Sequence, residues 1–217
     1  MKKESLKTQA YYIIKEKIVT CEYAPNSMIN EEILRNQVGA SRTPIRDALS
    51  RLEQEGLITI LPKKGILVSG LSISDINMIF EVRMLFEPYA LRNYGHALSE
   101  EVLLGLFSEL VAQLEGKEHD RFYDIDDRLH KTIVDTIPNR FLLQTYDLIH
   151  TQNLRYRIMT GQDQADRIVE TAKEHMDIVK ACLRRDWAAA AKSMAEHLQE
   201  SKNASFKLLF NYQSGTF

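Results

Sequence analysis

Three histidines and an aspartate in the second half of the chain each interrupt an otherwise apolar helical stripe. Asp126 and His130 are one helical turn apart, so their carboxylate and imidazole lie side by side on one face. His175 and His197 each lie in a further stripe with helical spacing. Three neutral imidazoles and one carboxylate suit Zn²⁺, Ni²⁺, Mn²⁺ or Fe²⁺, with one or two positions left for water or a ligand. The four residues are therefore candidate ligands of a divalent metal ion, with zinc as the first choice.

Spacing alone does not distinguish metal binding by these residues from an ordinary hydrogen-bonded role in the core. A single histidine on an apolar face is more often a hydrogen-bonded core residue than a metal ligand, and an Asp-x-x-x-His step is common by chance. Asp127 also competes with Asp126 for the role of the carboxylate ligand. The metal hypothesis requires that three separate helices converge in the core of one bundle.

Arg83 is a candidate for binding a ligand beside this metal. It lies in a stripe that is otherwise apolar, and a buried guanidinium needs a partner. One interpretation is a surface ion pair with Glu87, one turn further along. The other is a bidentate grip on the carboxylate of an effector opposite the metal. Asn153, on another largely apolar stripe, is a weaker candidate for the same pocket.

A different chemistry is indicated by residues 38–49, which read VGASRTPIRDAL. A glycine turn is followed by a helix whose back is apolar and whose leading end is polar. An arginine fork can grip a guanine edge in two places, and short hydroxyls fit against phosphate. Reading the major groove of DNA requires this arrangement, with the side chains at the start of a packed helix. The candidate DNA contacts in this stretch are Ser41, Arg42, Thr43 and Arg46.

Local signals predict the elements that position this stretch. A helix over about residues 6–20 ends before a Pro-Asn break, and Asn30 caps a short helix that Gly39 ends. Ser41 or Thr43 caps the next helix, and Gly56 stops it. Two short strands, at residues 57–61 and 66–69, flank a basic hairpin. Residues 1–70 are thus predicted to form a winged helix-turn-helix domain.

The remaining residues, 71–217, show helical periodicity almost throughout and no strand-like alternation of useful length. With the winged domain, they predict a mostly α fold that ends in an all-α antiparallel bundle. Breaks are expected near Gly95, Gly116, Pro138, Gly161 and residues 185–186. The predicted helices cover residues 74–93, 99–115, 120–136, 140–160, 164–184 and 187–210.

Charge and composition fit this division into two domains. Residues 1–70 carry 11 Lys and Arg against 8 Asp and Glu, whereas the remainder carries 17 against 22. A basic module joined to an acidic one fits a nucleic-acid reader with a partner domain that does not bind DNA. Cys21 and Cys182 form no CxxC pair, and no segment has 18 uninterrupted apolar residues. We expect a cytoplasmic protein that does not enter a membrane.

The run from Ser41 to Leu49, with Leu52-Glu53, Glu55–Ile58, Pro62 and Gly65, resembles the DNA-binding domain of GntR-family transcription regulators. The resemblance covers about residues 6–70. It implies that Ser41, Arg42, Thr43 and Arg46 meet phosphates and base edges, while Lys64 and Gly65 bring the wing to the minor groove. The chain departs from the family at Glu32, where many members carry an arginine that contacts DNA. Arg35 is the candidate that substitutes for it.

Residues 72–210 resemble the FCD effector domain of the FadR branch of the same family. The resemblance is carried by Glu81-Val82-Arg83 with Glu87, the Asp126-x-x-x-His130 step, His175 and His197. In the metal-binding members, the matching aspartate and histidines hold a divalent ion, and the ion takes a carboxylate effector. The resemblance implies the same ligand set here and favours the effector-binding role of Arg83.

The expected function is that of a DNA-binding transcriptional regulator and not that of an enzyme. Because members of the resembled family are most often repressors, we expect a repressor. A homodimer would bind a palindromic operator, and a small organic acid held by the metal and Arg83 would change operator affinity. One alternative is a metal-dependent enzyme in which the Asp/His₃ centre activates water. No general base is evident beside the centre, since Glu174 should point about 100° away from His175. Another alternative is a structural ion, or a sensor of the metal alone.

Overall fold

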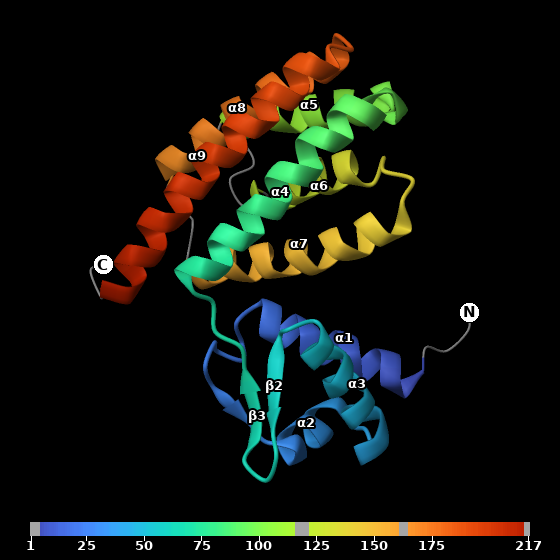
Figure 1. Cartoon of the computed structure of the whole chain (residues 1–217), viewed down its shortest axis with the longest axis vertical. Helices are drawn as coiled ribbons and strands as arrows, with labels where there is room; N and C mark the ends of the chain where they lie inside the picture. Colours follow the sequence, from blue (N-terminus) through green and yellow to red (C-terminus); the bar gives the residue numbers. More distant parts are fainter. Residues whose placement is uncertain (1–4, 116–121, 161–164, 215–217) are drawn as a thin grey trace. The chain divides into compact units, whose positions relative to one another are not determined.

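The computed structural model describes residues 5–115, 122–160 and 165–214 (Figure 1). The chain divides into two compact units. The first unit comprises Met1–Ser72 together with His150–Thr160, and the second comprises Ile73–Ile149 and Gly161–Phe217. The predicted fold class is confirmed: a small winged helix-turn-helix is followed by an all-helical bundle.

Three helices of the first unit begin and end where local signals place them. They are α1 (Leu6–Val19), α2 (Glu31–Val38) and α3 (Arg42–Gln54). The Asn30 side chain accepts a hydrogen bond from the backbone N–H of Glu32, as its predicted capping role requires. Gly39 ends α2 in the left-handed conformation, with φ of +67°, which glycine adopts without steric cost. Ser41 occupies the N-cap position of α3 without a side-chain capping bond, so Thr43 lies inside the helix.

A three-stranded antiparallel sheet completes the first unit. Its order is β1 (Met28–Ile29), β3 (Gly65–Val68) and β2 (Ile58–Leu61), so β3 is central. The β2–β3 hairpin is the predicted wing, whereas the two-residue β1 was not predicted. The sheet and helices close over one apolar core, to which every element contributes. Its buried residues are Ala10, Tyr11, Ile14, Ile18, Ile29, Leu34, Ala40, Ile45, Ala48, Leu49, Leu52, Leu57, Ile58, Ile66 and Val68.

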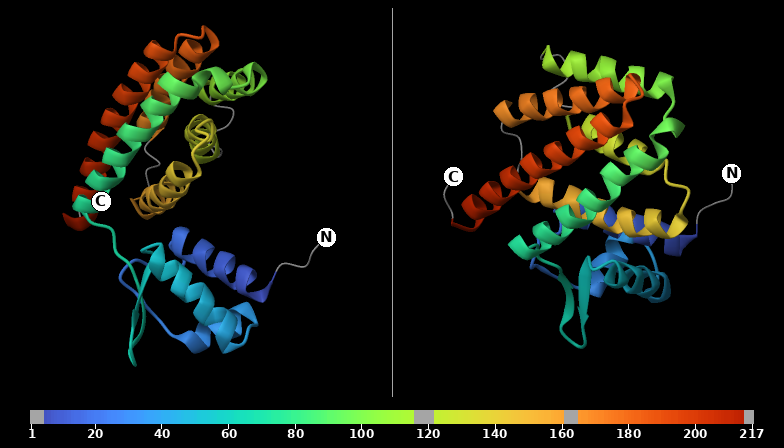
Figure 2. Two further views of the ribbon diagram at one scale, coloured as in Figure 1. Left: turned by 45° about the vertical axis from the view of Figure 1, so that its right-hand side comes forward. Right: turned by 45° about the horizontal axis from the view of Figure 1, so that its top comes forward.

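All the regular elements of the second unit, among its described residues, are helical. Its elements are α4 (Ile73–Tyr94), the 3₁₀ turn η1 (Gly95–Ala97), α5 (Glu100–Leu114), α6 (Phe122–Val134), α7 (Arg140–Thr160, whose last part belongs to the first unit), α8 (Ala165–Leu183) and α9 (Trp187–Ser214). Helix α4 lies alongside α9 and runs in the opposite direction (Figures 1 and 2). Helix α8 packs against both α9 and α5. The predicted breaks at Gly116 and Gly161 lie outside the described residues.

Among the described residues, none of the helices combines the length and the hydropathy that a membrane crossing requires.

Two glycines offer a matched test of packing in the bundle. A Cβ added to the buried Gly95 would lie 2.5 Å from Cε3 of the Trp187 ring, at the start of α9. We expect Gly95→Ala to lower the free energy of unfolding by about 1–3 kcal/mol, because the ring or the turn must move. Gly105→Ala is the control, since a Cβ there meets nothing within 4 Å inside helix α5. Thermal unfolding measures both; a Gly95→Ala protein as stable as the wild type would contradict the packing described.

Candidate metal centre and nucleic-acid interface

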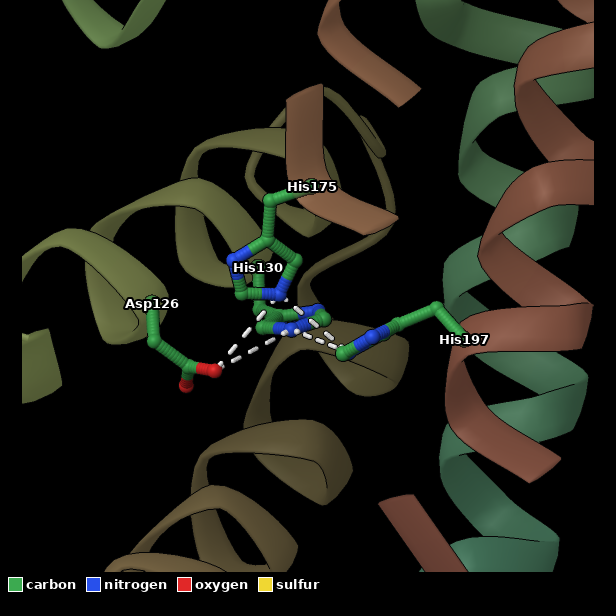
Figure 3. Close-up of side chains that lie close together, drawn as sticks. All are labelled: Asp126, His130, His175 and His197. Carbon is green, nitrogen blue, oxygen red and sulfur yellow. Dashed lines mark hydrogen bonds and ion pairs between the residues drawn. The ribbon is translucent and has the colours of Figure 1, made fainter. Parts of the chain in front are cut away.

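The bundle brings the four predicted metal ligands to one point (Figure 3). Helix α6 supplies Asp126 and His130, α8 supplies His175, and α9 supplies His197. We call these four residues the Asp/His cluster. One ligand atom from each lies within 4.8 Å of the others, and all four residues are buried. Asp126, and not the neighbouring Asp127, is therefore the carboxylate of the cluster.

The ring nitrogens at the centre of the cluster face one another. Nε2 of His197 lies 3.2 Å from Nε2 of His130 and 3.2 Å from Nε2 of His175. The Asp126 carboxylate is slightly further away, with Oδ1 at 3.6 Å from Nε2 of His175 and 3.9 Å from Nε2 of His130. The four potential donor atoms thus surround a common centre.

A buried carboxylate on α4 holds the outer nitrogen of one histidine. Glu87 is 0% exposed, and its Oε2 lies 2.6 Å from Nδ1 of His130. Its other oxygen accepts hydrogen bonds from Nε of Arg83 at 2.7 Å and from the Tyr146 hydroxyl at 2.8 Å. Burial alone would raise the pKa of Glu87, but the charges of Arg83 and His130 and their hydrogen bonds hold it well below its ordinary value. Glu87 is therefore ionised and can only accept.

A second carboxylate holds the outer nitrogen of another histidine. Oε2 of Glu174 lies 2.7 Å from Nδ1 of His197. Arg167 grips Glu174 with both terminal nitrogens, at 2.7 and 3.1 Å. Glu174 thus serves not its sequence neighbour His175 but a histidine of the adjacent helix α9. The spacing of residues along α8 could not reveal this contact.

The arrangement of the buried rings and their partners suits a cation. Burial, and next the charge of His130, hold the pKa of His197 well below 6.5, so this ring is neutral at neutral pH. A carboxylate at Nδ1 accepts a hydrogen bond from the N–H of that nitrogen, which favours the tautomer with the lone pair on Nε2. Nε2 of His197 lies 3.2 Å from Nε2 of His130, so the two ring nitrogens converge on the same buried point. Three imidazole nitrogens and one carboxylate oxygen around such a point are a donor set that fits the predicted divalent ion.

Of the two predicted effector-binding residues, Arg83 lies next to the cluster. It is buried and paired with Glu87, so the ion pair inferred from spacing exists but is not on the surface. Asn153 is also buried, in the part of α7 that belongs to the first unit. Effector binding by either residue stays a prediction.

The predicted DNA-contacting side chains lie on α3 and the wing. Ser41, Arg42, Thr43 and Arg46 are all exposed at the leading end of α3. A groove of about 700 Å³ runs between this helix and the wing, lined in part by Arg46, Lys64 and Gly65. Lys63 lines it too, although sequence reasoning named only Lys64 at the tip.

Two details of this surface concern helix α2. Nε of Arg46 lies 3.4 Å from a carboxylate oxygen of Glu31, in an exposed ion pair. Arg35 is only partly exposed, and its Nε is buried without a hydrogen-bond acceptor. Glu32 is exposed, and its backbone N–H donates a hydrogen bond to the Asn30 side chain.

The buried histidines predict how the stability of the metal-free protein depends on pH. The pKa values of His175 and His197 lie well below 6.5 in the fold, chiefly because of burial, so between pH 6.5 and 5 the unfolded chain binds more protons than the folded one. Stability is therefore expected to fall as pH falls through this window, by up to about 1.4 kcal/mol per histidine and pH unit. Glu87 adds little there, because its pKa is lowered from an ordinary 4.5 and most of its contribution is lost below pH 5.

Urea unfolding with a chelator present, at pH 7, 6 and 5, measures this slope. His175→Gln should flatten it, whereas His96→Gln, which changes an exposed histidine on η1, should leave it unchanged. Equal stability at pH 7 and pH 5 in the wild type would contradict the burial of neutral rings.

Comparison with known proteins relates both units to regulators of transcription. The chain is 28% identical over 195 residues to the HTH-type transcriptional repressor RspR of Escherichia coli (strain K12), which covers 88% of this chain and 85% of RspR. It is 24% identical to the gluconate operon transcriptional repressor of Bacillus licheniformis, over 86% of this chain and 79% of the relative. These relatives are transcriptional regulators and not enzymes, as predicted for this chain.

Solved structures agree with the fold. Escherichia coli McbR/YncC superposes with a TM-score of 0.78 over 94% of this chain and 99% of its own, at 17% identity. The metal-free FCD domain of TM0439 matches 66% of this chain and 100% of its own, with a TM-score of 0.59 and 25% identity. Residues 6–68 match the family model "Bacterial regulatory proteins, gntR family", and residues 78–200 match the FCD domain. The chain therefore belongs to the GntR family of DNA-binding transcriptional regulators, in the branch that carries a C-terminal FCD domain.

Proposed function

We propose that this regulator is a repressor whose operator affinity is controlled by a small carboxylate bound at a divalent metal in the FCD domain. The observation that carries the proposal is the Asp/His cluster, in which three Nε2 atoms and a carboxylate oxygen face one buried centre. The names of RspR and of the gluconate operon regulator support repression as the mode of action.

DNA contact is assigned to the leading end of α3 and to the wing. Ser41, Arg42, Thr43 and Arg46 would contact phosphates and base edges in the major groove, with Lys64 and Gly65 at the minor groove. The exposure of these α3 side chains and the groove beside the wing support the assignment. Arg35 is retained as a candidate contact from α2, in place of the arginine that is absent at Glu32.

We expect Arg46→Ala to weaken binding to the operator by about 5–150-fold, because one bidentate base contact contributes about 1–3 kcal/mol. Arg51→Gln is the control on the same helix, since the Arg51 guanidinium lies over the Tyr11 ring and beside Glu55. Mobility-shift titration measures affinity, and metal content should be the same in all three proteins. Wild-type affinity in Arg46→Ala would reject the assignment.

Two chains would bind a palindromic operator as a homodimer. Helix α4 offers a surface for pairing, because Met78, Leu85 and Tyr89 recur at helical spacing and are 50%, 65% and 40% exposed. Such a face on an isolated chain is typical of a subunit interface. The operator complex should therefore contain two chains, which its mass in light scattering reports.

Zn²⁺, Ni²⁺, Mn²⁺ or Fe²⁺ is the proposed ion, held by Asp126, His130, His175 and His197, with zinc as the first choice. When bound, the ion supplies a Lewis-acidic position for an anionic ligand. The Arg83–Glu87 and Arg167–Glu174 pairs are each neutral, so Asp126 and a divalent ion leave the centre with one net positive charge. A buried positive centre favours a small organic acid over a neutral ligand.

Arg83 is the proposed second anchor of the effector carboxylate. Its Nε is engaged by Glu87, which fixes the plane of the guanidinium beside the cluster. Asn153 is retained as a weaker candidate on the basis of its sequence pattern and its burial.

The switch is tested by operator mobility shift of the zinc-loaded protein with a panel of organic acids. At least one acid should change operator affinity by about 5–150-fold, the range that typical coupling free energies give. Asp126→Asn should retain operator binding and lose the response. If no acid changes affinity by even a few-fold, the proposed effector control is wrong.

The same assay separates the alternatives. Arg83→Lys preserves the charge opposite Glu87 but removes the planar fork, so a carboxylate sensor should lose much of its response while a pure metal sensor keeps it. A metal-dependent enzyme would instead consume an acid from the panel, which chromatography of the incubated mixture would detect.

A further inference from the structure

We propose that Glu87 and Glu174 are positioning residues that fix the tautomers of His130 and His197, and that each is held in place by its own arginine. The inference rests on the proposed metal site and deepens it: the strength of the site would depend on two carboxylates outside the ligand set. Neither residue contacts the centre itself.

The first series of contacts, Arg83–Glu87–His130, is fully buried. The Arg83 guanidinium and the Tyr146 hydroxyl bind one oxygen of Glu87, so the other oxygen is directed at Nδ1 of His130. These contacts are buried, and together they engage both oxygens of the carboxylate, which fixes its plane. The His130 ring is thus held with Nε2 toward the centre of the Asp/His cluster.

The second series of contacts, Arg167–Glu174–His197, also runs from arginine to carboxylate to histidine, but it is partly exposed. Arg167 on α8 binds both oxygens of Glu174, and it also donates to Oγ of Ser201 on α9 at 3.2 Å. Glu174 then accepts from Nδ1 of His197, so Nε2 of His197 faces the centre. The Glu174 side chain is 25% exposed, whereas Glu87 is 0% exposed. Glu174 can therefore be changed without leaving a charge in the core.

This arrangement has a chemical consequence for metal binding. A neutral imidazole has one lone pair on nitrogen, and it binds an ion only through the nitrogen that lacks the proton. A carboxylate at Nδ1 selects the tautomer with the lone pair on Nε2 and increases the basicity of that nitrogen. With two of three rings selected in advance, the ion meets a preformed set of donors.

The test compares Glu174→Gln and Glu174→Ala with Glu170→Gln. Glu170 lies one turn away on α8, is 66% exposed and also pairs with Arg167, at 3.6 Å, but it touches no histidine. Zn²⁺ affinity is measured by competition with a chromophoric chelator. Loss of such an outer carboxylate typically weakens metal binding by about 10–100-fold. We expect that loss in Glu174→Gln, a larger one in Glu174→Ala, and a change below about twofold in the control.

A second readout needs no metal. In the metal-free protein, ¹⁵N chemical shifts of the imidazole nitrogens report which nitrogen carries the proton. His197 should be protonated at Nδ1 in the wild type and in Glu170→Gln, and it should become a mixture of tautomers in Glu174→Ala. Circular dichroism checks that the variants are folded.

The outcomes are distinguishable. A wild-type protein that binds none of the candidate ions rejects the proposed metal function, whereas the tautomer measurement still judges the role of Glu174. Unchanged Zn²⁺ affinity and an unchanged His197 tautomer in Glu174→Ala would overturn the inference, whatever the wild-type protein binds.

Discussion

The convergence of three buried imidazole rings on one point is the feature on which the proposed metal site depends. Three rings from three helices turn their Nε2 atoms toward one buried point, with separations as short as 3.2 Å. Buried polar side chains are costly in a core unless they have partners. The donor set of this cluster matches the ligands that a divalent cation prefers.

The two arginine–carboxylate pairs orient two of the three imidazole rings. Arg83–Glu87 and Arg167–Glu174 neutralise themselves, so they bring no net charge to the centre. Each carboxylate also contacts Nδ1 of one histidine, so that the other ring nitrogen, Nε2, faces the centre. The contacts come from α4 and α8, while the ligands come from α6, α8 and α9. The packing of α4 against α6 and of α8 against α9 therefore orients the ligands of the site as well as stabilising the bundle.

Much of the fold and of the ligand set could be predicted from the sequence, because both depend on local periodicity. The Asn30 cap, the Gly39 stop and the wing follow from residue types at fixed offsets. Asp126 and the three histidines were found because each is a metal-binding residue type in an apolar stripe. The two-residue strand β1 is too short to show alternation, so it was missed.

The surroundings of the ligands could not be predicted in this way. The i, i+4 step from Arg83 to Glu87 is the same for a surface pair and for a buried one, and only tertiary packing distinguishes them. The Glu174–His197 contact joins two helices across a turn, at a distance along the chain that no helical period encodes. Spacing thus indicated which side chains could bind an ion, whereas the contacts that orient them depend on how helices pack.

The ion pair between Arg46 and Glu31 has a consequence for how DNA binding would respond to ionic strength. If Arg46 contacts DNA as proposed, it must leave a carboxylate that then attracts a cation from solution. Counterions released from the phosphates are partly taken up again by Glu31. The slope of the binding constant against salt concentration would then count fewer ionic contacts than the interface contains.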